Sequence, residues 1–395
     1  MTHLTRLLAA SALAAGLGAC ATAPQPALPI DAASLHARIL TLDTHVDIPL
    51  DYMVEVDPST DTDLQVDFAK MEAGGLDAAF FIVYTPQTAV SPEGYAEAAR
   101  IADTRLEAIE RMVATYPDRI ALARSAEDVR SIVASGRLAA LIGMENAYPM
   151  GDSVAMVPEL AERGVRYVGL THFGANQFGD SSGTKDYETD AALTTHGGLS
   201  PLGRELVSAL NDHGILVDVS HAGDETTRQA VALSRAPVIA SHSGVDGEFD
   251  HIRNLPDDLL DAIAAKGGVV QLVALGAYVR PWTDEQQAAL DALPDDMEED
   301  ARDTAVAAIR ALGPVTVADY ADHIDYAVAR MGIDHVGIAS DFDGGGGIEG
   351  WQDASTTQVV TEELLARGYS EEDIAKIWGG NVLRIMEAAE AAAIR

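Results

Sequence analysis

Ala139-Ala140-Leu141-Ile142-Gly143-Met144 is a short apolar run that ends at a single carboxylate, Glu145. An uninterrupted apolar run of this length indicates a strand that is buried on both faces, whereas a half-exposed strand alternates polar and apolar residues. Strands buried on both faces belong to parallel sheets that are covered by helices. This stretch therefore predicts a parallel sheet with a polar group at the carboxyl end of one of its strands.

Similar runs recur along the chain, and segments with helical periodicity separate most of them. Eight parallel strands alternating with helices are the number that closes a (β/α)₈ barrel of the TIM type. The pattern leaves an open, doubly wound sheet as the alternative. Residues 276–334 form a long connection with acidic helices of its own, so we expect an insertion between strands 7 and 8. The eight runs are Ile39–Asp43, Leu76–Tyr84, Ala139–Met144, Tyr167–Leu170, Ile215–Val219, Val238–Ala240, Val269–Ala274 and Val336–Ala339.

The composition is that of a globular protein and excludes several classes of partner. Hydrophobic residues make up 48% of the 395 residues, yet no charge-free apolar run reaches the length of a membrane span. The 62 acidic and 26 basic residues give a net charge of −36, which repels nucleic acid. Cys20 is the one cysteine, so an intrachain disulfide and a cysteine-based zinc site are excluded. Any metal must be held by His, Asp and Glu.

The first residues are typical of an export signal. Arg6 precedes an apolar run over 7–19, which predicts a signal peptide at residues 1–19. Leu17-Gly18-Ala19-Cys20 resembles a bacterial lipobox, so we expect Cys20 to be lipidated. An Ala/Pro-rich tether over 20–35 and a single domain over 36–395 follow. The expected location is the periplasmic face of a bacterial membrane, reached only through the lipid anchor; a soluble periplasmic protein is the alternative.

Polar residues able to bind metal or move protons stand at the carboxyl ends of six of the expected strands. In a barrel of this type the chemistry belongs at that end. Three histidines and two carboxylates exceed what one catalytic zinc needs, whereas two metals that share a carboxylate use them all. Glu145 comes from a strand between the two groups and is the expected bridge. The residues are His45, Asp47, Glu145, His172, His221, His242 and Asp341.

Several short motifs surround these residues in a fixed order. They are Leu42-Asp43-Thr44-His45-Val46-Asp47, Gly143-Met144-Glu145-Asn146, Leu170-Thr171-His172, Gly198-Leu199-Ser200-Pro201-Leu202-Gly203, Val217-Asp218-Val219-Ser220-His221, Ala236-Pro237-Val238-Ile239-Ala240-Ser241-His242-Ser243, Arg253-Asn254-Leu255-Pro256-Asp257-Asp258, Ser340-Asp341-Phe342-Asp343-Gly344 and Gly379-Gly380-Asn381. From about residue 36 to residue 390 the chain resembles the membrane (renal) dipeptidases, the zinc dipeptidase branch of the amidohydrolase superfamily.

The resemblance implies a binuclear zinc dipeptidase that hydrolyses dipeptides by attack of a metal-bridging hydroxide, with the stereochemistry of the carboxyl-terminal residue left open. By this resemblance His45, Asp47 and Glu145 match the ligands of one zinc, Glu145, His221 and His242 match those of the other, Asp341 matches the catalytic acid/base, His172 matches the imidazole at the scissile carbonyl, and Arg253 matches the receptor of the substrate carboxylate.

Some alternatives stay open at this point. Leu275 stands where the family can carry a substrate-binding tyrosine, and Tyr278 is a candidate replacement. Arg253 could instead pair on the surface with Asp257 or Asp258. The same barrel could hydrolyse an N-acyl amino acid, a lactam or a β-lactam, or could bind ligands without catalysis. The native metal and a homodimer are also left open.

Overall fold

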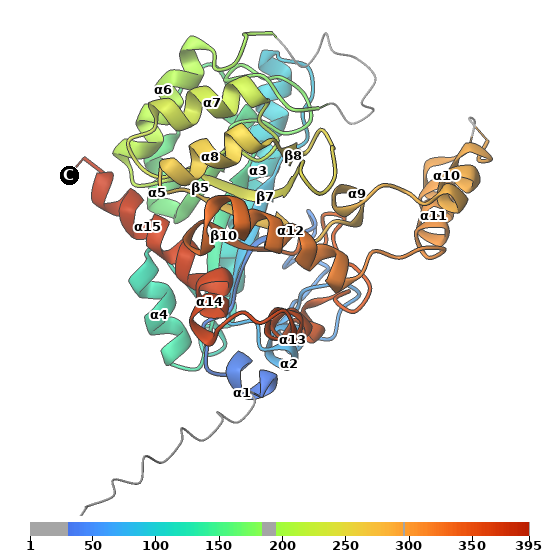
Figure 1. The fold of residues 1–395 in the computed structure, drawn as a ribbon. Coiled ribbons are helices and arrows are strands. Elements are labelled where there is room, and N and C mark those ends of the chain that lie inside the picture. The colour runs from blue at the N-terminus through green and yellow to red at the C-terminus, as the bar shows by residue number, and fades with distance from the viewer. Residues whose placement is uncertain (1–30, 184–194, 295–296, 395) are drawn as a thin grey trace, which may run out of the picture.

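Eight parallel strands form a barrel at the centre of the molecule, and helices surround it (Figure 1). The computed structural model describes residues 31–183, 195–294 and 297–394. The expected fold is confirmed, because each of the eight apolar runs contributes one strand to a single parallel path. In their order around the barrel the strands are β1 (Leu42–Asp47), β2 (Ala78–Tyr84), β4 (Leu138–Glu145), β5 (Val165–Gly169), β6 (Leu216–Asp218), β7 (Ile239–Val245), β9 (Val269–Val273) and β10 (Val336–Ala339).

The barrel closes between its first and last strands. Val46 of β1 and Phe342, which follows β10, form an isolated parallel bridge. The N–H of Asp47 donates to the Phe342 carbonyl at 2.9 Å, and the N–H of Asp341 donates to the His45 carbonyl at 3.1 Å. An open doubly wound sheet would leave the two outer strands unpaired, so this alternative is excluded. Closure also brings the carboxyl ends of β1 and β10 together.

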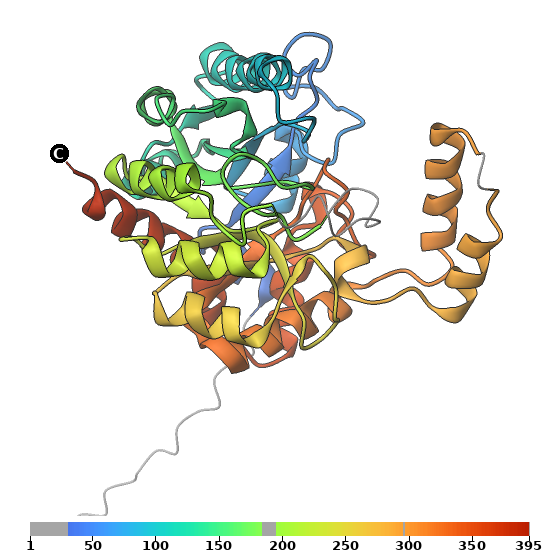
Figure 2. The ribbon, with the colours of Figure 1, turned by 90° about the horizontal axis from the view of Figure 1, so that it is seen from above.

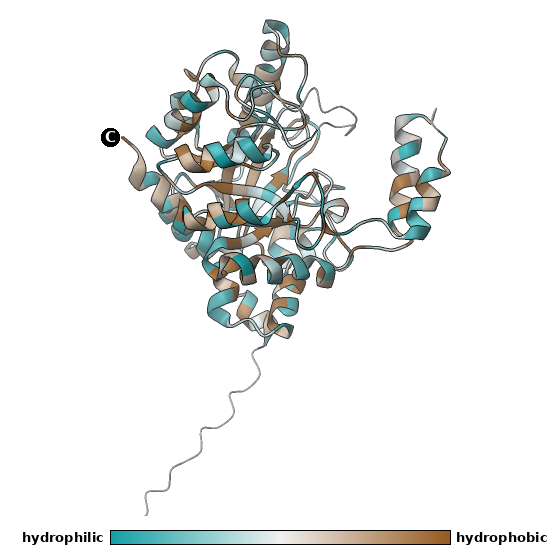
Figure 3. Cartoon of the chain, turned by 45° about the horizontal axis from the view of Figure 1, so that its top comes forward, coloured by the Kyte–Doolittle hydropathy of each residue, from teal (hydrophilic) through white to brown (hydrophobic). Residues whose placement is uncertain are grey.

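Apolar side chains fill two layers, one inside the barrel and one beneath the helices. Alternate residues of β4, such as Ala139 and Leu141, belong to the inner layer together with residues of the last helix, α15 (Asn381–Ala392). The residues between them, such as Ile142, pack under the outer helices. Figure 3 shows hydrophobic residues gathered on the central strands. Because side chains alternate along a strand, Glu145 continues the inward row that begins at Ala139.

Two very short strands were missed by the sequence analysis. They are β3 (Ile120–Leu122), which pairs with β4, and β8 (Asn254–Leu255), which pairs with β7. Segments of three and two residues are too short to produce a recognisable apolar run, so only the tertiary pairing reveals them.

Capping residues fix the starts of several helices. Ser91 accepts a hydrogen bond from the Gly94 N–H at the start of α3, where Pro92 occupies the first turn. Thr316 and Asp319 form a capping box at α12, and this helix has the expected bounds. The remaining helices also have defined bounds. They are α1 (Ala32–His36), α2 (Phe68–Gly74), α3 (Pro92–Thr115), α4 (Ala126–Ala134), α5 (Val157–Arg163), α6 (Pro201–Asp212), α7 (Asp224–Leu233), α8 (Asp257–Ala265), α9 (Gly276–Val279), α10 (Asp284–Asp291), α11 (Glu299–Arg310), α12 (Val317–Met331), α13 (Gln358–Ala366) and α14 (Glu371–Ala375).

The expected insertion between the seventh and eighth barrel strands lies between β9 and β10. Its helices α10 and α11 form a hairpin that stands away from the barrel (Figures 1 and 2). Gln286 fixes the base of this hairpin, because its side-chain amide donates to the carbonyls of Ile309, Arg310 and Gly313. The insertion therefore leaves the strand order of the barrel unchanged.

The expected signal peptide and Cys20 lie outside the described residues, as does most of the expected tether. The packed structure begins before residue 36, since α1 occupies the last residues assigned to the tether. Asp31 caps this helix, and Leu35 and His36 are buried. None of the helices within the described ranges is both long and apolar enough to cross a bilayer.

Candidate metal centre

The backbone is irregular where the candidate ligands stand. His45 in β1 and His242 in β7 each lie in a β-bulge, because the strand register shifts across each of these residues. His221 and Asp341 have left-handed φ angles of 64° and 59°. A bulge re-aims the side chain of its strand, and a left-handed non-glycine residue costs about 1–3 kcal/mol. The surrounding fold therefore holds four functional side chains in orientations that a regular strand would not give them.

Five side chains converge around Glu145 at the barrel mouth. The Oε2 atom of Glu145 lies 3.6 Å from His45 Nε2, which is 3.5 Å from Asp47 Oδ2. The Oε1 atom lies 3.0 Å from His221 Nε2 and 3.3 Å from His242 Nε2. The donor atoms thus form two groups that share Glu145, and within each group they lie within 4.8 Å of one another. These are the two ligand sets that the family resemblance implied.

Hydrogen bonds behind two of the imidazoles determine which nitrogen faces the centre. The Tyr167 hydroxyl donates to a backbone carbonyl at 3.0 Å, so it accepts from His45 Nδ1 at 3.1 Å. The Ser241 hydroxyl donates to Asp218 at 2.7 Å and accepts from His242 Nδ1 at 2.8 Å. Since each hydroxyl has one proton to give, both Nδ1 atoms carry hydrogen. The Nε2 atoms then present lone pairs to the centre, which is the tautomer that a metal ligand needs.

This donor set fits divalent metal ions. His45 Nε2 is buried and has no hydrogen-bond partner within the described part of the chain. The Nε2 atoms of His221 and His242 are 2.9 Å apart, and both face Glu145. Imidazoles and carboxylates without thiols suit Zn²⁺ and neighbouring divalent ions. The residues present can therefore hold the metal that the sequence predicted.

His172 and Asp341 border the two groups. Asp341 Oδ1 lies 3.7 Å from His45 Nε2, and His172 Nε2 lies 3.8 Å from Glu145 Oε1. Burial raises the pKa of Asp341 to about 8 and lowers the pKa of His172 to about 4. Asp341 also forms a third group of close donor atoms with His45 and His242. Both residues are thus brought to the centre, as the strand-end pattern predicted.

Arg253 is buried beside the site. Its Nη2 atom donates to the His242 carbonyl at 3.1 Å, and only 2% of its surface is exposed. The guanidinium carbon lies 5.3 Å from the centre of the Tyr278 ring and 6.0 Å from that of Phe173. Its Nε atom is buried and lacks a hydrogen-bond partner among the described residues. A donor of this kind is suited to an anion that arrives with a ligand.

The alternative of a surface ion pair for Arg253 is contradicted. Asp257 pairs with Arg330 at 3.0 Å, and Asp258 pairs with Arg228 at 2.7 Å. The two aspartates thus have other partners, while Arg253 is turned toward the barrel.

The site opens into a cavity of about 520 Å³, a size that suits a small molecule. Leu275 and Tyr278 both line it, so the tyrosine reaches the site from the first turn after β9. Tyr84 and Arg105 also line it, and the sequence analysis missed both. The position of Tyr84 at the end of β2 was a usable signal. Arg105 lies in the middle of α3, and only the packing of that helix against β2 brings it to the cavity.

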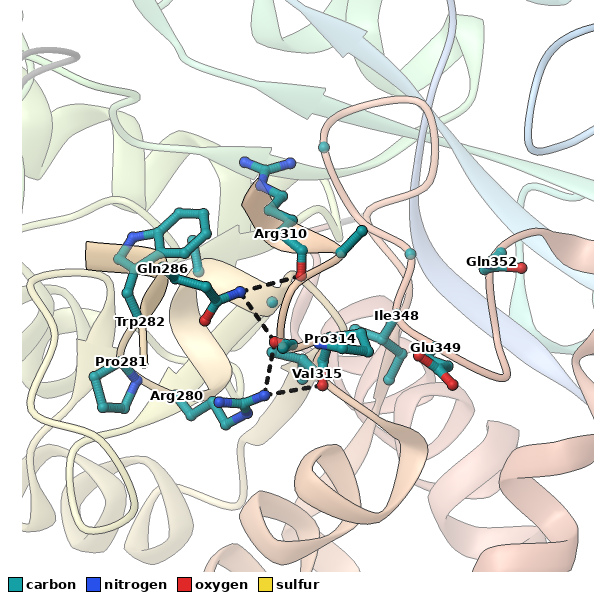
Figure 4. Close-up of a pocket in the computed structure, with 16 residues that line it drawn as sticks. Arg280, Pro281, Trp282, Gln286, Arg310, Pro314, Val315, Ile348, Glu349 and Gln352 are labelled. Atoms are coloured by element: carbon teal, nitrogen blue, oxygen red, sulfur yellow. Dashed lines mark hydrogen bonds between the residues drawn. The ribbon is translucent and has the colours of Figure 1, made fainter. Parts of the chain in front are cut away.

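A second cavity, of about 290 Å³, lies at the base of the α10–α11 hairpin (Figure 4). Trp282 and Arg310 are among its lining residues. Arg280 donates to the carbonyls of Gly313 and Pro314, so its side chain serves to hold the hairpin base. None of the candidate site residues lines this cavity.

Comparison with known proteins identifies the family. Residues 30–395 match the sequence profile of the family described as "Membrane dipeptidase (Peptidase family M19)". The chain belongs to this family. Membership confirms the resemblance inferred from the motifs and makes the chain a metallo-dipeptidase, a hydrolase of peptide bonds.

Relatives and solved structures agree with this assignment. The chain is 32% identical over 335 residues to Dipeptidase verJ of Clonostachys rogersoniana, a match that covers 82% of this chain and 76% of that protein. It is 30% identical over 373 residues to Dipeptidase 3 of Rattus norvegicus, covering 92% and 68%. The crystal structure of the probable dipeptidase PvdM from Pseudomonas aeruginosa is similar with a TM-score of 0.83 and 36% identity, covering 92% of this chain and 98% of that one. A dipeptidase AC described as a metallo peptidase of family M19 gives a TM-score of 0.72 at 25% identity, covering 89% and 98%.

Proposed function

We propose that this member of the family hydrolyses dipeptides with two divalent metal ions, Zn²⁺ by preference. One ion would be held by His45, Asp47 and Glu145, and the other by Glu145, His221 and His242. The observation that carries this proposal is the division of Glu145, whose two oxygens face two different donor groups. A carboxylate in that arrangement is the bridge that a two-metal site requires.

When bound, two divalent ions polarise the scissile carbonyl and lower the pKa of a water molecule toward neutrality. The protein side chains would carry out the remaining steps. His172 would donate a hydrogen bond to the carbonyl oxygen and so stabilise the negative charge that develops there. Asp341 would take the proton of the attacking water and return it to the departing amine. The proximity of both side chains to Glu145 and His45 supports these roles.

The substrate would be fixed at its carboxyl end by Arg253. A guanidinium presents paired donors that match a carboxylate, and the unpartnered Nε of Arg253 supports this role. Recognition of the terminal carboxylate close to the scissile bond explains a preference for dipeptides over longer chains. The L or D configuration accepted at the carboxyl-terminal position is part of the test below.

We further propose that the chain is exported and anchored through Cys20, with residues 36–395 as the enzyme domain. The sequence pattern of the first residues supports this proposal. A homodimer remains a prediction of the same standing.

A metal-exchange experiment tests the function. Chelation should abolish hydrolysis of L-Ala-L-Ala and L-Ala-D-Ala, and about two Zn²⁺ per chain should restore it. The N-acetylated dipeptide should be a poor substrate, whereas a hydrolase of N-acyl amino acids or lactams would prefer it. Full activity in metal-free protein, or preference for the acetylated compound, would overturn the proposal.

A further inference from the structure

Arg105 is a buried cation in the wall of the active-site cavity. It lies in α3, is 9% exposed and lines the cavity together with Tyr84 and Asp47. Burial lowers the pKa of Arg105, but a guanidinium group is not deprotonated at neutral pH. A permanent positive charge is therefore present at the cavity surface.

Two backbone carbonyls fix the orientation of this side chain. Its Nε atom donates to the Ile48 carbonyl at 3.0 Å, and its Nη1 atom donates to the Tyr84 carbonyl at 3.0 Å. The guanidinium carbon lies 5.5 Å from the centre of the Tyr84 ring. No acceptor within the described ranges bonds to Nη2 of Arg105. The guanidinium is thus held firmly and still has donors to offer.

Arg105 lacks a counter-ion among the described residues, since no carboxylate oxygen of that set lies within 4.0 Å of its nitrogens. Buried charges are usually paired, because an unpaired charge loses its hydration without compensation. Asp47 is the carboxylate with the strongest electrostatic influence on Arg105. Under the proposed function Asp47 is a metal ligand, so its charge would be neutralised by the ion. The positive charge of Arg105 then remains available for a ligand.

Arg105 and Arg253 stand on opposite sides of the barrel mouth. Arg105 is tied to the end of β2 through Tyr84, and Arg253 is tied to β7 through the His242 carbonyl. Three strands separate β2 from β7 in either direction around the barrel. The proposed metal ligands lie between the two arginines. A dipeptide whose terminal carboxylate meets Arg253 would therefore direct its amino-terminal residue toward Arg105.

We propose that Arg105 makes this site selective for dipeptides with a carboxylate side chain on the amino-terminal residue. The inference rests on the proposed function and names its substrate class. A side-chain carboxylate placed against Arg105 gains a charge-assisted hydrogen bond and supplies the missing counter-ion. The cavity of about 520 Å³ has room for such a side chain.

Three dipeptides with the same carboxyl-terminal residue test this proposal, namely Glu-Ala, its neutral isostere Gln-Ala, and Ala-Ala. In the wild-type enzyme kcat/KM for Glu-Ala should exceed that for Gln-Ala by about tenfold or more, mainly through KM. In Arg105→Gln the ratio should fall to about one. Arg100→Gln is the matched control, because Arg100 lies on the same helix and is exposed in an ion pair with Glu97.

A binding measurement provides a readout that does not depend on turnover. A phosphinate mimic of Glu-Ala should bind Arg105→Gln about tenfold more weakly than it binds the wild type, by calorimetry. The matching mimic of Ala-Ala should bind both proteins equally. If Arg105→Gln does not fold, Arg105→Met and Arg105→Lys replace it: the Met variant should lose the preference for Glu-Ala, and the Lys variant should keep its direction.

The outcomes separate the two proposals. If the metal-loaded wild type cleaves none of the three dipeptides, the proposed function fails. If it cleaves Ala-Ala but does not prefer Glu-Ala to Gln-Ala, the function stands and the role of Arg105 is overturned. Equal losses for all three substrates in Arg105→Gln would show that the side chain only positions Ile48 and Tyr84. An unchanged Glu-Ala to Gln-Ala ratio in that variant would also overturn the inference.

Discussion

Glu145 is the residue on which both proposed metal ions depend, because each of its oxygens faces a different donor group. Glu145→Gln should lower the affinity of both ions together, by about 100-fold or more. Metal content after dialysis against buffered free Zn²⁺ measures this. Asp47→Asn is the control and should weaken a single ion. Loss of just one ion in Glu145→Gln would show that the carboxylate does not bridge.

Arg253 presents a second test at the level of a single residue. Arg253→Met should cut kcat/KM for Ala-Ala by about 100-fold, because a charge-assisted hydrogen bond and the alignment of the substrate are lost. The dipeptide amide lacks the terminal carboxylate and should lose far less. Arg228→Met removes an exposed arginine that pairs with Asp258 and serves as control. Equal losses for acid and amide would contradict the assigned role.

At the scale of elements, the bulged strands explain how ordinary parallel strands carry a metal centre. In β1 the side chains of His45 and Asp47 both reach the centre, while Val46 between them packs outward under the helices. The bulge at His45 and the hydrogen bond from its Nδ1 to Tyr167 fix the ring together. Gly143 makes this possible, since a Cβ there would lie 2.2 Å from the Tyr167 ring.

The first helix, α1, docks on the barrel through His36. Its ring bonds to the Thr361 hydroxyl at 2.7 Å and to the Gly74 carbonyl at 2.9 Å, and it meets the edge of Trp378. Burial lowers the pKa of His36 below its ordinary value of 6.5. The unfolded chain therefore binds a proton near pH 6.5 that the folded chain refuses until the pH is lower. Stability attributable to this group is complete above pH 6.5 and declines as the pH falls.

His36→Gln should remove this dependence. Between pH 7.5 and 5.5 the free energy of unfolding of the wild type should fall more steeply than that of the variant, by up to about 1.4 kcal/mol per pH unit below 6.5. Denaturant titration at the two pH values measures the difference. His213→Gln replaces an exposed histidine and provides the control. Parallel pH profiles for the wild type and His36→Gln would refute the assignment.

At the scale of the whole molecule, the lipid anchor decides where the enzyme works. Cys20→Ser should move the protein from the membrane fraction to the soluble fraction without changing its activity on Ala-Ala. The wild type should stay in the membrane fraction at high salt, because the several acyl chains of a bacterial lipoprotein hold by hydrophobic burial rather than by charge. Recovery of the mature wild type as a wholly soluble protein would refute the anchor.

The sequence alone determined the number of parallel strands, the residue types of the centre and the end of the barrel where they lie. Apolar runs and strand-end residues are local, so they can be read without knowing what packs against them. Glu145 is an example, since it ends its run with no other polar residue nearby in the strand.

Only the tertiary structure decided how these residues meet. Closure through Val46 and Phe342, the bulge at His45 and the left-handed His221 all depend on register between strands that are far apart in sequence. Arg105 reaches the cavity because α3 packs against β2, and nothing in the helix itself indicates that position. The orientation of a side chain depends on long-range packing, which local sequence patterns do not encode.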